Sequence, residues 1–496
     1  MKLVIYKNYK IILILVLSSL LRFSNLPAKI TFTADEAYLS YVAQTLIKNF
    51  HIIWIGWSAL GFDVYLGPLW IYVIYPFLYL SHGNPIILGY ISGFLGVLTT
   101  FAIYKIGSKF FNHQVAILSS LSYALLPLLI YYDQKPYPPA IPLISLLVTF
   151  ALLKVRKSAK WWVVISFLYG LVFNIHLSLV LLAFPILYAL FTGKKYLNKK
   201  ILVSSFLVFI VTVSPLIVFD YYKKGYNIQA PLRAFNASQN STEKTSGHYD
   251  ELFSSFGRIW YLNSFSEVAD EIIPTCKENA LSTYSRPPLG ISIVSLAIFI
   301  SFALNKKTWK DYSRKMLLFV SLTFIIPFTL VTVINPVEYY LLGFFPILLI
   351  ITSVVIYDQR KIVKMFLLLL MFSCLIYAPF VTLRANTNYG LEAKKELAQQ
   401  VAQLVDGKPY YLQARGGCQS VGGWRYLFSI YGQRPAKSYD DVSFGWLYPD
   451  EITSEKSVYE VLVVEKRASD HTNLYTNYVN KVTSGGYEAL IYKISD

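Results

Sequence analysis

Cysteine and charge are both scarce in this chain of 496 residues. The three cysteines, Cys276, Cys374 and Cys418, have no metal-site spacing, and a Cys276–Cys418 disulfide is left open. Only 15% of the residues are charged, 55% are hydrophobic, and the mean hydropathy is +0.47. Ordinary soluble domains are far more polar. The composition therefore excludes a soluble globular protein and predicts an α-helical polytopic membrane protein.

Positive charge is in excess, with 45 Lys and Arg against 28 Asp and Glu. Such an excess can indicate nucleic-acid binding, but in a membrane protein it first indicates which loops face the cytoplasm. The basic residues gather in five loops between apolar runs, at 105–109, 154–160, 194–200, 306–315 and 360–364. We therefore expect the lipid bilayer as a partner and no nucleic acid.

About eleven apolar runs are long enough, or nearly so, to cross a bilayer. They lie at residues 11–26, 86–104, 114–131, 138–153, 161–175, 177–192, 201–219, 289–304, 316–334, 339–356 and 364–382. A further apolar segment, 64–80, contains Pro68 and Pro76, and would place all five basic loops outside if it crossed. We predict that this segment is an external juxtamembrane or re-entrant helix.

This topology gives a multi-pass protein of the plasma membrane with a cytoplasmic N-terminus and a retained first span. Large segments then lie outside, at 27–85, 220–287 and 383–496. The sequence predicts two domains, a transmembrane domain at 1–382 and a small extracytoplasmic α/β domain at 383–496.

The predicted α/β domain begins where the composition becomes that of a soluble protein. Residues 391–405 have helical periodicity, and three segments read as strands, at 409–413, 458–465 and 486–494. The glycine-rich stretch 416–423 could bind a phosphate or form turns, and it matches no phosphate-binding fingerprint.

An acidic pair, Asp35-Glu36, lies in the first polar stretch after the first apolar run. Residues 34–50 have helical spacing, so an acid here can cap a helix by accepting free backbone N–H groups. Carboxylates just outside a bilayer can also act on substrates held by lipid. Both interpretations remain open for the pair.

Other polar residues stand at the outer ends of predicted spans. They are Asp133, Lys135 and Tyr137 in YYDQKPYPPA, His176 in FNIHLSL, and Glu338 and Tyr339 in NPVEYY. An acid and a base at the membrane surface suit a phosphate-linked lipid and its acceptor. Ordinary loop charges, interfacial tyrosines and a packing histidine are the alternatives. No group has metal-ligand spacing, so a divalent cation is permitted but not indicated.

The layout resembles the GT-C membrane glycosyltransferases, over about residues 1–382. The likeness is carried by the first span, the Asp35-Glu36 pair, a proline-containing juxtamembrane helix GPLWIYVIYPFLYL, a basic turn after the next span, and the polar motif at Asp133. The group it is most similar to is the protein O-mannosyltransferase and lipid A aminoarabinose transferase superfamily.

This resemblance implies a glycosyltransferase of the cell envelope that moves a hexose or pentose from a polyprenyl phosphate to an extracytoplasmic glycan, lipid or protein, with inversion. Asp35 would be the general base, and Glu36 would orient the acceptor or support Asp35. Asp133 would be the second external acid, and Lys135 would neutralise the departing phosphate where many relatives have an arginine. Glu338-Tyr339 stands where many relatives have Arg-Tyr.

Three other functions fit parts of the sequence. A transporter or flippase for lipid-linked sugars would place charges near the membrane midplane, whereas the acids here lie at span ends. An oligosaccharyltransferase-like GT-C enzyme would carry a Trp-Trp-Asp motif, but Trp161-Trp162 is followed by Val163. A non-catalytic scaffold would use the acidic pair only as a cap. The transferase is the prediction that absorbs most of these features.

Overall fold

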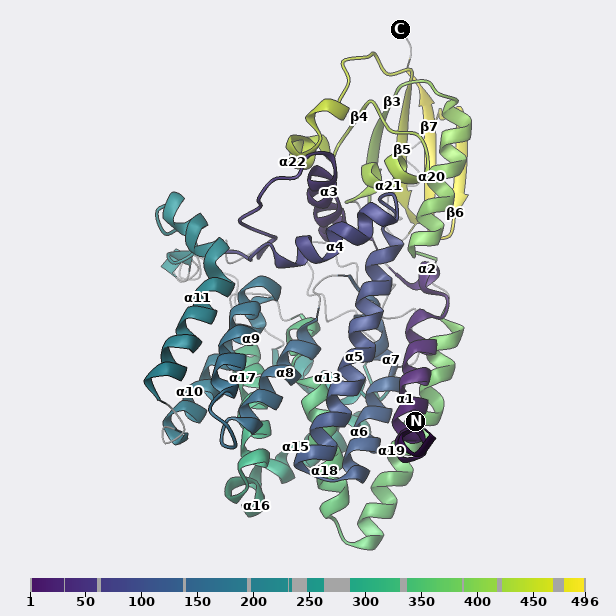
Figure 1. Ribbon diagram of the computed structural model, residues 1–496. Helices are drawn as coiled ribbons and strands as arrows, with labels where there is room; N and C mark the ends of the chain where they lie inside the picture. Colours follow the sequence, from purple (N-terminus) through teal and green to yellow (C-terminus); the bar gives the residue numbers. More distant parts are fainter. Residues whose placement is uncertain are drawn as a thin grey trace.

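The computed structural model describes most of the chain, and Figure 1 shows a helical bundle with a β-sheet at one end. The described residues are 2–30, 32–59, 64–136, 140–193, 198–230, 232–233, 248–262, 286–330, 337–385, 388–416, 422–466 and 477–494. Tyr137, Cys276 and Cys418 lie outside these ranges, so the predictions made for them are untested.

Each of the eleven predicted spans contains an apolar helix. The bundle consists of α1 (Lys2–Phe23), α5 (Ile86–Phe110), α6 (His113–Leu125), α7 (Pro127–Gln134), α8 (Ile141–Lys154), α9 (Trp161–Ile175), η1 (Leu177–Leu182), α10 (Ala183–Thr192), α11 (Lys199–Tyr222), α15 (Leu289–Leu304), α16 (Lys306–Lys310), α17 (Tyr312–Leu330), η3 (Glu338–Leu341), α18 (Phe345–Asp358) and α19 (Lys361–Arg384). In the described ranges, α5, α11, α17 and α19 are long and apolar enough to cross a membrane singly, and α6 with α7 form a bent pair that is either a fifth, broken span or a re-entrant loop. The total of eleven spans stays a prediction.

The break between α6 and α7 bends the chain by 63°. Leu126 is extended, with φ −69° and ψ 125°, because the residue before a proline is pushed out of the helical region. Pro127 then starts α7, where its missing N–H is tolerated. After the bend, α7 continues to Gln134, the residue before Lys135.

The segment predicted as a juxtamembrane helix forms α4 (Leu69–Leu80), directly after Pro68. A helix of 12 residues is about 18 Å long, well short of the ~30 Å hydrocarbon core. Figure 1 shows α4 lying across the end of the bundle, beside α3 (Ala34–Lys48). The short elements α2 (Leu26–Lys29), β1 (Ser58–Ala59) and β2 (Val64–Tyr65) also lie between α1 and α4 in the chain.

The C-terminal part contains a five-stranded sheet in the order β4-β3-β5-β7-β6. Its elements are α20 (Leu391–Val405), β3 (Tyr410–Arg415), α21 (Trp424–Tyr431), β4 (Lys437–Ser438), α22 (Asp441–Phe444), η4 (Gly445–Leu447), η5 (Pro449–Glu451), β5 (Tyr459–Glu465), β6 (Asn480–Ser484) and β7 (Tyr487–Lys493). β3 is parallel to β4 and β5, whereas β7 is antiparallel to β5 and β6. α20, β3, β5 and β7 lie where the sequence patterns place a helix and three strands.

The C-terminal part and the helices α3 and α4 share one hydrophobic core, which joins residues of α3, α4, α20, α21 and the sheet. The backbone N–H of Leu391 donates to the carbonyl of Ile30 at 2.9 Å. Gly390 lies so close to α2 that a Cβ there would be 2.2 Å from the carbonyl oxygen of Ala28. The hydroxyl of Tyr426 donates to the carbonyl of Gly83 at 2.7 Å.

The close approach at Gly390 gives a first prediction. Gly390→Ala places a methyl group against backbone that cannot move aside, so we expect it to destabilise the protein by about 1–3 kcal/mol. Thermal unfolding of the purified protein in detergent measures this. Gly290→Ala on α15 is the matched control, because a Cβ at Gly290 meets nothing within 4 Å. Equal melting temperatures for the two variants would contradict the contact.

Candidate active site

The site begins at the N-terminus of α3, where Glu36 forms the cap. One oxygen of its carboxylate accepts hydrogen bonds from the backbone N–H of Thr33 at 2.8 Å and from the Thr33 hydroxyl at 2.6 Å. This is the capping-box arrangement, and Glu36 is buried. The capping role that the sequence allowed for the acidic pair is thus filled by its second member.

Asp35 is in a different situation, although it is the next residue along the chain. Its side chain is half-buried and makes no hydrogen bond to any part of the chain that the structure describes. Burial, reinforced by the neighbouring Glu36 charge, raises the pKa of Asp35 to about 7, while Lys135 acts in the opposite direction. A carboxyl group with this pKa can take up a proton near neutral pH, which is the property a general base needs.

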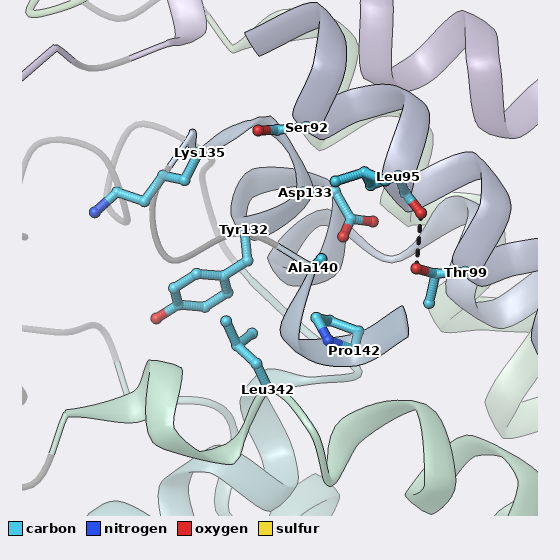
Figure 2. A pocket seen from close by; sticks show the side chains of 9 residues that line it. All are labelled: Ser92, Leu95, Thr99, Tyr132, Asp133, Lys135, Ala140, Pro142 and Leu342. Atoms are coloured by element: carbon cyan, nitrogen blue, oxygen red, sulfur yellow. Dashed lines mark hydrogen bonds between the residues drawn. The ribbon is translucent and has the colours of Figure 1, made fainter. Parts of the chain in front are cut away.

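Lys135 is brought within electrostatic range of Asp35 from a distant part of the sequence. It directly follows α7, and its ammonium lies 5.8 Å from the centre of the Tyr131 ring. Figure 2 shows Lys135 and Tyr132 extending to one side of a small cavity and the Asp133 carboxylate turned to the other. Lys135 is thus directed away from the Asp133 carboxylate, and its charge lowers the pKa of Asp35.

Asp133 is bound inside the bundle by a cation that the sequence analysis missed. Arg22, at the end of α1, donates to Oδ2 of Asp133 from Nε at 2.9 Å and from Nη2 at 2.6 Å. The hydroxyl of Tyr123 donates to Oδ1 at 2.9 Å. Both oxygens are thus engaged internally. A signal for Arg22 did exist, because a charge within an apolar span needs a partner.

Glu338 is likewise held by internal contacts. Its carboxylate accepts from Tyr132 Oη and Ser255 Oγ, both at 3.1 Å, and lies 3.3 Å from Nη2 of Arg258. Ser255 and Arg258 belong to α13 (His248–Arg258), so Glu338 joins this helix to α7. The side chain is completely buried. Here too the sequence indicated the acid but not its cation.

His176 and Tyr339 lie close together at the C-terminal end of α9. Nδ1 of His176 lies 2.9 Å from Ser178 Oγ and accepts from the backbone N–H of Ser178, which caps η1. Its ring centre lies 5.6 Å from that of Tyr339 and 5.7 Å from that of Tyr340. This is the packing role that the sequence left open for a single histidine.

The structure therefore divides the predicted site residues into two sets. The side chains of Glu36, Asp133, His176 and Glu338 make hydrogen bonds within the protein. The side chains of Asp35 and Lys135 make none to the residues that the structure describes, although the backbone N–H of Lys135 donates to the Tyr132 carbonyl. Within those ranges, no three His, Cys, Asp or Glu side chains are grouped as metal ligands. What the arrangement offers chemically is one base with a pKa near neutrality and one cation facing it.

The internal pair gives a second prediction. Arg22→Met leaves the carboxylate of Asp133 buried without its cation, and we expect a loss of about 3–5 kcal/mol in unfolding free energy. Adding Asp133→Leu in the same chain removes the uncompensated charge and should recover most of that loss. Thermal unfolding in detergent compares the three proteins.

Arg314→Met is the matched control, because it breaks an ion pair with Asp358 that solvent reaches. We expect it to cost no more than about 1 kcal/mol. A double variant no more stable than Arg22→Met alone would contradict the paired burial.

Comparison with known proteins relates this arrangement to a family. Residues 66–219 match the model of the dolichyl-phosphate-mannose-protein mannosyltransferase family. No curated protein sequence matches the chain.

Two solved structures share the fold. The first is ArnT from Cupriavidus metallidurans bound to undecaprenyl phosphate, with a TM-score of 0.62, 11% identity and coverage of 98% of each chain. The second is the oligosaccharyltransferase AglB from Archaeoglobus fulgidus in complex with an inhibitory peptide and a dolichol-phosphate. Its TM-score is 0.50 at 13% identity, over 94% of this chain and 70% of that one. The resemblance inferred from the layout is confirmed: residues 66–219 match that family model, and the chain has the fold of these two structures.

Proposed function

We propose that this protein transfers a sugar from a polyprenyl-phosphate donor to an acceptor outside the cytoplasm, with Asp35 as the general base. The observation that carries the proposal is the state of Asp35, which is half-buried, has a pKa near 7 and faces Lys135. The family segment at residues 66–219 supports a lipid-phosphate donor. The structures of ArnT and AglB, which share the fold and contain undecaprenyl phosphate and a dolichol-phosphate, also support such a donor.

The proposed step is a single displacement at the sugar C1. The Asp35 carboxylate takes the proton of the acceptor hydroxyl as that oxygen forms a bond to C1. The bond between C1 and the phosphate oxygen breaks, and its electron pair leaves with the polyprenyl phosphate. Lys135 supplies positive charge close to where the negative charge grows, an effect that is strong in a partly dehydrated site.

The division between Asp35 and Glu36 supports inversion at C1. A retaining mechanism needs a second carboxylate, about 5 Å from the first, to act as nucleophile. The neighbouring carboxylate is Glu36, and its bonds to Thr33 hold it in the cap. A single displacement assisted by one base inverts the configuration at C1. The acceptor class and the sugar are left to experiment.

Removal of the Asp35 charge tests the proposal directly. Purified protein is incubated with a panel of polyprenyl-phosphate hexoses and pentoses, with and without a chelator, and donor consumption is measured. Asp35→Asn should lower turnover by about 10²–10⁴-fold, the usual contribution of a general base.

Asp406→Asn is the matched control, because Asp406 is exposed and its left-handed backbone also suits asparagine. It should leave turnover unchanged. Full activity in a folded Asp35→Asn protein would refute Asp35 as base. Lack of donor consumption by the wild type across the panel would refute the transferase itself.

The pH profile gives an independent test. Asp35 must be ionised to accept a proton, so kcat should fall about tenfold per pH unit below a midpoint near 7 and be level above it. Lys135 lowers the pKa of Asp35, so Lys135→Met should move the midpoint upward, while Lys135→Arg should retain it. A midpoint near 4 in the wild type, or one unmoved by Lys135→Met, would contradict the pairing.

A further inference from the structure

A buried lysine of the C-terminal part lies directly beneath the cap of α3. Lys394, on α20, is 2% exposed, and its ammonium donates to the backbone carbonyl of Phe32 at 2.7 Å. Phe32 immediately precedes Thr33, the cap residue, and Asp35 follows two residues later. Figure 1 shows α20 running from the sheet down to α2, at the entrance to this segment.

The ammonium of Lys394 is enclosed by aromatic rings. It lies 4.9 Å from the ring centre of Trp424 and 5.3 Å from that of Tyr487. These faces attract a cation and exclude water from it. Since a lysine ammonium is rarely buried without partners, this enclosure marks it as a built feature of the interface.

Three acids face Lys394 from three different elements. They are Glu36 on α3, Glu465 on β5, and Asp440 before α22, and each raises the pKa of Lys394, while burial lowers it to about 8. The lysine therefore remains charged at neutral pH. Its charge lies close to the Glu36 carboxylate, the group that caps α3.

Gly422 and Gly423, which directly precede α21, lie against residues 32–34. A Cβ at Gly422 would lie 2.4 Å from the Cβ of Ala34, and one at Gly423, whose φ is +90°, would lie 2.9 Å from the Phe32 ring. Through these contacts and the hydrogen bond of Lys394, the C-terminal part holds residues 32–34. The end of the glycine-rich stretch thus serves close backbone packing at the candidate site.

We propose that Lys394 is a positioning residue, which holds the start of α3 through the Phe32 carbonyl and the Glu36 charge and so fixes where the Asp35 carboxylate stands. The proposal rests on the proposed function for its catalytic consequence only. The C-terminal part is then a component of the catalytic apparatus rather than an appended binding domain.

Amide hydrogen exchange tests the positioning without any substrate. In purified full-length Lys394→Met, amides of residues 33–37 should exchange about ten- to a hundredfold faster than in the wild type, as expected for loss of a charge-assisted hydrogen bond. Amides of α5 should be unchanged. Lys395→Met is the matched control, because Lys395 is exposed on the same helix and should leave all protection as it is.

Kinetics with the best polyprenyl-phosphate sugar of the panel test the consequence. Lys394→Met should lower kcat about a hundredfold, the cost of misplacing a reacting group by about 1 Å, with the KM for the donor within about twofold. Lys394→Gln, which can still donate to the Phe32 carbonyl, should fall between Lys394→Met and wild type.

The possible outcomes are distinguishable. Unchanged protection of residues 33–37 in Lys394→Met overturns the proposal. Loss of protection throughout the protein in both Lys394→Met and Lys394→Gln also overturns it, because it would show a purely structural lysine. Raised KM with unchanged kcat also overturns it. If the wild type consumes no donor, the proposed function fails, while the exchange result still decides whether Lys394 holds α3.

Discussion

The ion pair between Arg22 and Asp133 is the interaction on which the arrangement of the site depends. It lies in the helical bundle, where each charge alone would be strongly unfavourable. Arg22 also donates to the carbonyls of Tyr123 and Ala124, at 3.1 and 3.2 Å. The Tyr123 carbonyl would normally accept from residue 127, but Pro127 has no N–H. The arginine therefore compensates for the break that the proline makes in the span.

The Arg22–Asp133 ion pair holds the C-terminal ends of α1 and α7 together. α1 ends just after Arg22, and the chain continues through α2 into α3, while α7 ends at Gln134, directly after Asp133 and before Lys135. The side-chain amide of Gln134 donates to the Arg22 carbonyl at 2.8 Å, which is a second link between the ends of α1 and α7. Asp35 and Lys135 thus approach each other because the residues that precede them are bound together in the bundle. Their partnership is a consequence of burying one arginine and one aspartate.

The sequence predicted the features that depend on local pattern. Helical spacing indicated α3 and α20, and the Asp35-Glu36 pair indicated a helix start. That α4 does not cross the membrane stays a prediction from its prolines and the loop charges. The functions of the individual acids could not be read in the same way. Glu36 and Asp35 differ by one position on a helix, and only the cap geometry separates them. The partners Arg22 and Arg258 come from distant segments, so the roles of Asp133 and Glu338 depend on tertiary structure.

The position and stability of α3, the helix that carries Asp35, depend on the elements packed against it. An isolated helix of 15 residues is marginal in water, and α3 buries side chains on more than one face. α4 covers one of these faces. The other is covered by the C-terminal part, where the Tyr41 ring lies 5.1 Å from that of Tyr426 and 4.7 Å from that of Tyr448. Burial is also the main cause of the raised pKa of Asp35, at the start of this helix, so the position of the helix and the pKa of its carboxyl group are linked.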